Sequence, residues 1–164
     1  MDPWTPLIAV HVIAASYVLV LGPVNIFRRR RDRIHKIIGF TWVTAIVTTC
    51  VLSFWIRDEG HFTWLHGLSL FTLTTVSLGV FSAVRGNIPA HRGNMIGSYT
   101  GTLIAFGFAA AIPGRRIPEL ISTEPATVVF IAALILVTAM AFVFTLRRTV
   151  PAARAAPRPR VHGA

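Results

Sequence analysis

The sequence predicts an all-α integral membrane protein, built as an antiparallel four-helix transmembrane bundle with a fifth transmembrane helix. Hydrophobic residues make up 54% of the 164 residues and charged residues 13%, whereas soluble domains carry about 25% charge. Several apolar stretches without charges reach about 20 residues, the length that crosses a bilayer as a helix. The connections between them are short, so consecutive helices should be antiparallel neighbours.

Five spans are predicted along the chain. The first, residues 6–27, has no charge and ends against a run of arginines. The second, 35–56, starts at a histidine, and the third, 63–84, follows a short charged loop. The fourth, 92–112, follows another histidine, while the fifth, 126–146, has neither histidine nor charge and is expected at the periphery.

The spans form one predicted transmembrane domain, residues 1–147, followed by a tail. Residues 113–125 contain three prolines and mixed charge, which predicts an outer loop with one helical turn. Residues 148–164 are rich in Pro, Ala and Arg, which predicts a basic, disordered cytoplasmic tail.

The basic residues divide unequally between the two predicted sides. A simple weave places 13 of the 16 Lys and Arg residues on one side, with the C-terminus. The positive-inside rule therefore predicts a multi-pass plasma-membrane protein with its N-terminus outside and its C-terminus in the cytoplasm. The basic residues lie where topology signals lie, and this accounts for the net charge of +10. We therefore expect no nucleic-acid partner.

Four histidines lie near the ends of four predicted spans. His11 and His66 fall near the outer ends of the first and third spans, and His35 and His91 open the second and fourth at the inner side. In an up-down bundle these are two diagonal pairs, one towards each surface. Facing imidazoles on bundle helices are suited to axial ligation of haem iron. The pattern predicts two b-type haems, with His11 and His66 on the outer iron and His35 and His91 on the inner.

Two further residues bear on these sites. Arg92 directly follows a predicted ligand and is a candidate partner for a haem propionate. His61 lies five residues before His66, but it precedes the span among charged residues, so His66 is the preferred outer ligand. The sequence has no HExxH motif, and it lacks the CxxCH signal of covalently attached haem, so any haem is non-covalent haem b.

Three short motifs carry a resemblance to a known family. The pattern H-x10-GP starts at His11, HKIIGF starts at His35 and HRGNM starts at His91. Over roughly residues 8 to 112 the chain resembles a family of small, largely uncharacterised bacterial membrane proteins, which implies a bacterial plasma membrane. In architecture it also resembles the two-haem transmembrane b-type cytochromes that pass electrons from ascorbate or quinols. That resemblance implies electron transfer across the membrane.

These patterns predict a di-haem cytochrome that carries electrons across the membrane and is linked to the quinone pool. Expected partners are membrane lipid, quinone or protein electron carriers, and a second copy or a larger complex. Whether the chain is an oxidoreductase in its own right stays open. Two alternatives remain: a haem-free scaffold or accessory subunit of a respiratory complex, and a transition-metal-binding membrane protein.

Overall fold

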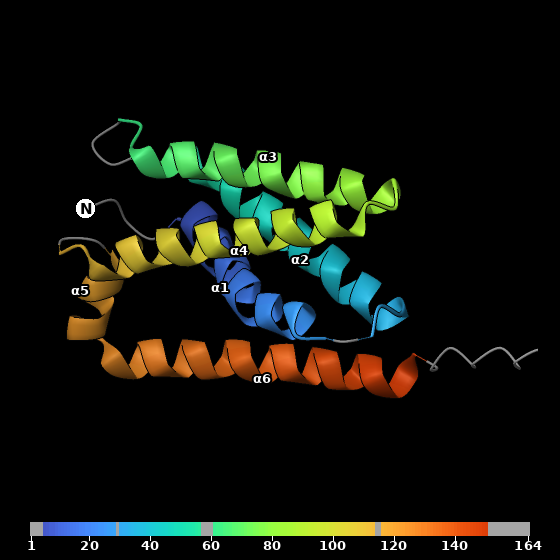
Figure 1. Cartoon of the computed structure of the whole chain (residues 1–164). Helices are drawn as coiled ribbons and strands as arrows, with labels where there is room; N and C mark the ends of the chain where they lie inside the picture. Colours follow the sequence, from blue (N-terminus) through green and yellow to red (C-terminus); the bar gives the residue numbers. More distant parts are fainter. Residues whose placement is uncertain (1–4, 29, 57–60, 114–115, 151–164) are drawn as a thin grey trace, which may run out of the picture.

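The computed structural model describes residues 5–28, 30–56, 61–113 and 116–150, and Figure 1 shows its helices. In chain order these are α1 (Pro6–Ile26), α2 (Arg33–Ser53), α3 (Trp64–Val84), α4 (Ile88–Ala111), α5 (Arg116–Thr123) and α6 (Pro125–Thr149). The described residues contain no strand, so the predicted all-α fold is confirmed. Most of the predicted tail, residues 151–164, lies outside the described part.

The first four helices form a ring. Each helix contacts the next, and α4 closes the ring by contacting α1. Among the described residues, the backbones of diagonal helices are not in contact with each other; the diagonal helices are α1 and α3, and α2 and α4. Figure 1 shows α3 and α4 side by side along their length, with α6 on the opposite side of α1. Helix α5 joins α4 to α6, which packs outside the ring against α1 and α2.

Four helices are long and apolar enough to cross a membrane: α1, α2, α3 and α6. Helix α4 is not among them, although residues 92–112 were predicted to span. Its first turns carry polar side chains, including His91, Asn94 and Ser98, which lower its hydropathy. Because α4 packs along α3, some of these polar side chains have partners there: His91 contacts the Gly79 carbonyl and Ser98 the Thr75 hydroxyl.

Helix ends differ from the predicted spans where side chains cap the backbone. Helix α2 starts at Arg33 because the Asp32 carboxylate accepts the N–H of His35 at 3.1 Å. Helix α4 starts at Ile88, where the Asn87 side chain accepts the N–H of Ala90 at 3.1 Å. The predicted single turn between the last two spans is an eight-residue helix, α5.

The middle of the bundle is closely packed around two large aromatic side chains. Trp42 of α2 is buried and donates its indole N–H to the Val18 carbonyl of α1 at 3.0 Å. Tyr99 of α4 donates its hydroxyl to the Leu19 carbonyl at 3.1 Å. Both rings lie against Gly22, because a Cβ there would sit 2.5 Å from Tyr99 and 3.2 Å from Trp42. A glycine therefore lets α1, α2 and α4 meet at one level.

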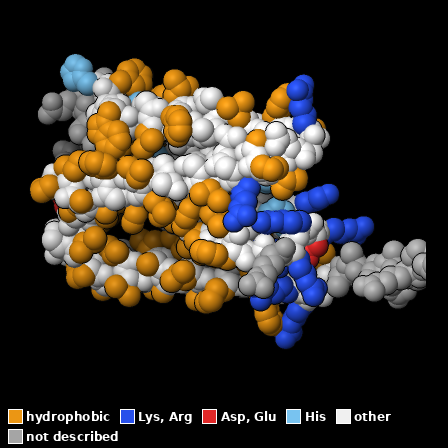
Figure 2. All heavy atoms as spheres, in the orientation of Figure 1, with side chains coloured by type: hydrophobic (Ala, Val, Ile, Leu, Met, Phe, Trp, Pro, Cys, Tyr) orange, Lys and Arg blue, Asp and Glu red, His pale blue; other side chains and the backbone are white. Residues whose placement is uncertain are grey.

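Positive charge gathers at one end of the molecule. Figure 2 shows the Lys and Arg side chains clustered there, with hydrophobic side chains over the rest of the visible face. The cluster combines the α1–α2 connection, the α3–α4 connection and the last turn of α6. The fold thus brings together the cations that the sequence divides among three segments.

We expect Asp32→Ala to lower the thermal unfolding temperature of the detergent-purified protein at neutral pH. The Arg28 guanidinium, 2.6 Å from the Asp32 carboxylate, and the His35 N–H hold the pKa of this carboxyl below its ordinary value. Such a group contributes stability above its ordinary pKa of about 4 and loses it as the pH falls through the lowered value. Thermal unfolding curves for wild type and variant should therefore converge in acid.

The matched control is Asp32→Asn, which keeps a capping oxygen but loses the charge. It should fall between wild type and Asp32→Ala. Equal unfolding temperatures for wild type and Asp32→Ala at neutral pH would show that the cap contributes nothing measurable.

Candidate functional site

The histidines on α1 and α3 lie at the same end of the bundle. His11 is in the first two turns of α1, and its ring reaches the last turns of α2 at Thr49. His66 is the third residue of α3, and its ring lies 6.1 Å from that of Phe54, just past the end of α2. A hydrogen bond of 2.8 Å between Ser53 and Ser69 joins the same ends of α2 and α3. Both imidazoles therefore border the end of α2.

The histidines on α2 and α4 lie at the opposite, basic end. His35 is the third residue of α2, and His91 is in the first turn of α4. Both helices begin at this end, after the α1–α2 and α3–α4 connections. The two predicted pairs thus occupy opposite ends of the bundle, on diagonal helices.

His11 and His91 are held in the same way. The Nδ1 of His11 lies 3.0 Å from the Thr49 carbonyl oxygen, and the Nδ1 of His91 lies 2.9 Å from that of Gly79. A carbonyl oxygen only accepts, so each Nδ1 carries the proton and donates it. In the neutral ring Nε2 then keeps an unprotonated lone pair. Metal-ligating histidines are commonly held by this type of bond, which fixes the tautomer and the ring orientation.

His66 has a different environment. Its side chain is buried, and its Nε2 has no hydrogen-bond partner. The Thr63 N–H donates to Nδ1 at 2.9 Å, so in the neutral ring Nε2 carries the proton. Thr63 also offers acceptors, since its hydroxyl oxygen lies 3.2 Å and its carbonyl oxygen 3.3 Å from the same Nδ1. The residue can therefore support either tautomer of His66.

His35 is half-buried and also accepts at Nδ1. Its partner is the Arg31 guanidinium at 3.3 Å, which also donates to the Asn25 carbonyl. Arginine only donates, so the neutral His35 ring carries its proton on Nε2. Each pair thus combines two kinds of histidine. One donates a hydrogen bond to a carbonyl of a neighbouring helix, and the other accepts one from a residue three or four positions earlier in the chain.

The two ends of the bundle correspond in an inverted way. At one end, His11 of α1 donates to a carbonyl in the last turns of α2; at the other end, His91 of α4 donates to a carbonyl in the last turns of α3. Helix α1 therefore plays the same part as α4, and α2 the same part as α3. His35 and His66 are both third residues of their helices. The same local arrangement therefore occurs at both ends, in opposite orientation.

Asn25 is a polar residue that sequence reasoning did not identify. Its Oδ1 is buried without a hydrogen-bond partner, and its amide nitrogen lies 3.1 Å from where a Cβ on Gly39 would be. Buried polar atoms without partners are uncommon and costly. His66 and Asn25 provide one such atom at each end of the bundle. An amide near the inner end of the uncharged first span is the signal that could have drawn attention to Asn25.

The remaining candidates take other positions. Arg92 is exposed on α4 beside His91, and His61 is exposed before α3. Among the described residues no three His, Cys, Asp or Glu side chains gather into a metal-binding group.

Four apolar helices of membrane-spanning length, packed with a basic end, define a multi-pass helical membrane protein. A family model described as "Predicted membrane protein (DUF2306)" matches residues 8–147, and the chain belongs to this family. This confirms the resemblance to an uncharacterised membrane-protein family. No curated protein and no solved structure matches the chain significantly.

Proposed function

We propose that this protein is a transmembrane b-type cytochrome with one bis-histidine haem towards each membrane surface. His11 and His66 would hold the haem at one end, and His35 and His91 the haem at the basic end. The observation that carries the proposal is the bonding of His11 and His91. Each donates Nδ1–H to a carbonyl of the adjacent helix, which leaves an oriented Nε2 lone pair available to iron.

The other two histidines would complete the donor set after a change of tautomer. Ligation through the buried, unpartnered Nε2 of His66 would require its proton on Nδ1, where the Thr63 hydroxyl and carbonyl oxygens can accept it. His35 opens α2 at the same end of the bundle as His91, and its ligation through Nε2 would place the proton on Nδ1 in place of the Arg31 hydrogen bond. Haem iron, when bound, supplies one-electron redox chemistry. The chain itself supplies axial nitrogens, low-polarity surroundings and, through exposed Arg92, a cation for an anionic propionate.

Two alternative functions differ from this proposal in what they require. A transition-metal site built only from protein side chains usually needs three or more ligands, which the described residues do not bring together. Haem needs only two axial ligands, because the macrocycle provides the other four nitrogens. A haem-free scaffold or accessory subunit of a respiratory complex would leave the carbonyl-bonded histidines without a chemical role.

Electron transfer across the membrane implies partners at both faces. The quinone pool is the proposed partner within the membrane, and soluble or membrane-bound carriers would exchange electrons at the surfaces. A second copy of the chain or a larger complex would provide further partners. The chain would act as a transmembrane electron carrier in a bacterial plasma membrane.

We expect the basic end of the bundle to face the cytoplasm. Lys and Arg side chains cluster at that end, and the positive-inside rule places such residues on the cytoplasmic side. A reporter fused after Arg160 should lie in the cytoplasm, and a reporter inserted near Asp58 should lie outside the cell. Both insertion points lie outside the described residues. A cytoplasmic Asp58 reporter would invert the assignment of the two histidine pairs.

The cofactor is tested by its haem content. Protein purified in detergent from haem-replete cells should be red, and pyridine extraction should give haem b at about two per chain. The variant His61→Ala is the matched control and should keep the wild-type haem content, because this exposed residue is close to His66 in sequence but belongs to neither pair. Colourless protein with a blank metal analysis would support the scaffold alternative.

A further inference from the structure

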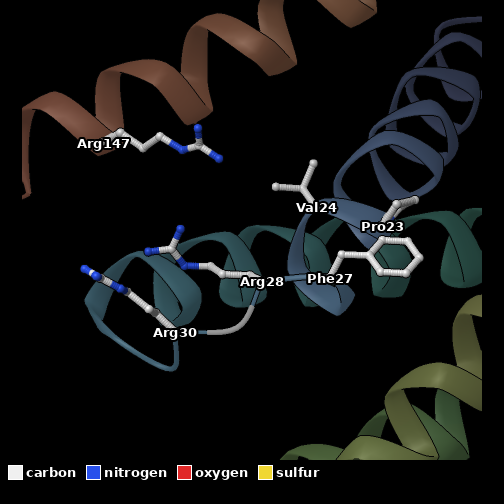
Figure 3. A pocket seen from close by; sticks show the side chains of 6 residues that line it. All are labelled: Pro23, Val24, Phe27, Arg28, Arg30 and Arg147. Carbon is white, nitrogen blue, oxygen red and sulfur yellow. The ribbon is translucent and has the colours of Figure 1, made fainter.

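Two adjoining hollows lie between α1 and α6 at the basic end, outside the four-helix ring. The first has a volume of about 520 Å³, and its lining residues are labelled in Figure 3. The second has a volume of about 330 Å³ and extends between the helices along Val20 of α1 and Met140 and Val143 of α6. Val24 and Arg147 line both. The two hollows therefore form one groove, which we call the α1–α6 groove.

The wider end of this groove is cationic. Arg28 and Arg30 come from the α1–α2 connection, and Arg147 comes from the last turn of α6. Figure 3 shows all three side chains around the same hollow, with Val24, Pro23 and Phe27 on the side of α1. Asp32 is the one carboxylate ion-paired with them among the described residues, and it pairs with Arg28. The opening thus has a net positive charge.

The narrower end of the groove is apolar and lies between two membrane-spanning helices. Its lining comes from α1 and α6, both long and apolar enough to cross the bilayer. Direct contact between these helices includes the buried Ala139 and a hydrogen bond of 2.8 Å from Tyr17 to Thr138. The groove begins beside Ala139 and ends at Arg147. It therefore runs from the interior of the membrane to the level of the headgroups.

We propose that the α1–α6 groove binds an anionic phospholipid. The phosphate would lie among Arg28, Arg30 and Arg147, and one acyl chain would lie along Val20, Met140 and Val143. Guanidinium groups form strong, charge-assisted hydrogen bonds with phosphate oxygens, and basic pockets at the cytoplasmic side of membrane helices bind anionic headgroups. A free phosphate would leave the apolar part empty. The lipid would thus hold α6 against α1, independently of whether haem is bound.

Lipid retention by the intact, detergent-purified protein tests this site. After delipidation, native mass spectrometry should show phosphatidylglycerol binding about tenfold more tightly than phosphatidylcholine. Arg147→Gln should reduce the affinity for phosphatidylglycerol about tenfold, because it removes one charge-assisted hydrogen bond. Arg148→Gln is the matched control: it removes the adjacent charge, and Arg148 is not among the residues that line the groove. Its affinity should stay within about twofold of wild type.

A second pair of variants tests the acyl chain. Met140→Trp places a larger side chain in the groove and should weaken phosphatidylglycerol binding. Val137→Trp adds a similar side chain to an exposed position of α6 outside the groove and should not. Equal binding of the two lipids, or equal losses for Arg147→Gln and Arg148→Gln, would overturn the site. Complete displacement of the lipid by inorganic phosphate, with Met140→Trp unaffected, would also overturn it and indicate a free-anion site instead.

Discussion

His11→Ala and His66→Ala should each abolish the same one of two haem b signals in a reduced-minus-oxidised spectrum and leave the other. Both residues lie at the end of the bundle that adjoins the last turns of α2, whereas the other pair lies at the basic end. The helix rise of 1.5 Å per residue separates the levels of His11 and Phe27 by about 24 Å. One haem cannot reach both levels, so loss should occur by pairs.

His35→Ala and His91→Ala should abolish the second signal. Any of the four variants should also stop electron transfer between donor and acceptor on opposite sides of a vesicle, because the path requires both haems. Two results would contradict this assignment. Loss of one signal in both His11→Ala and His35→Ala would show that the pairs are not diagonal. Loss in His61→Ala with a silent His66→Ala would show that the outer ligand is His61.

Gly22→Ala should destabilise the bundle more than a methyl added at Gly79 or Gly97. The new Cβ would sit 2.5 Å from two ring atoms of Tyr99 and 3.2 Å from the indole nitrogen of Trp42. Neither ring moves easily, because each donates a hydrogen bond to a carbonyl of α1. Overpacking of this kind costs about 1 to 3 kcal/mol. The thermal unfolding temperature in detergent should fall accordingly.

Two other glycines supply the comparison. Gly97→Ala on α4 has no neighbour within 4 Å of the added Cβ, and the higher helix propensity of alanine should leave stability unchanged or improved. At Gly79 the added Cβ would meet the flexible end of Met95, which can move aside, and would lie 3.1 Å from the Cβ of Asn94. Stability should therefore fall, but less than at Gly22. If Gly22→Ala unfolded at the wild-type temperature, α1 and α4 could not be packed as closely as the structure has them.

The helices and their order could be predicted from the sequence, because length and hydropathy alone define apolar spans. The ring arrangement also follows from connections too short to pass over a neighbouring helix. Helix α4 is the exception, because its first turns are polar and its hydropathy is lower than that of the membrane-spanning helices. Its position in the bundle depends on packing against α3. The caps at Asp32 and Asn87 were readable in principle, but the predicted limits followed charge rather than capping chemistry.

The histidines could be found from the sequence, but their bonding could not. The partners of His11 and His91 are backbone carbonyls of Thr49 and Gly79, and every residue has a carbonyl. Which one faces a ring depends on the longitudinal offset and rotation of packed helices. No residue type marks that position. The same holds for Asn25, whose amide nitrogen lies beside Gly39 of α2 and whose oxygen is buried without a partner.

The inverted correspondence between the two ends has a consequence for direction. Both ends hold one histidine that donates to a neighbouring helix and one that accepts close by, so the two ends share the same arrangement of histidines. The guanidinium groups gathered at one end break this equivalence. In the proposed cytochrome, this positive charge would stabilise an added electron and make that end its lower-energy position. The polarity of the molecule would then reside in its surface arginines, and neutralising them, rather than exchanging histidines, would flatten the energy difference across the membrane.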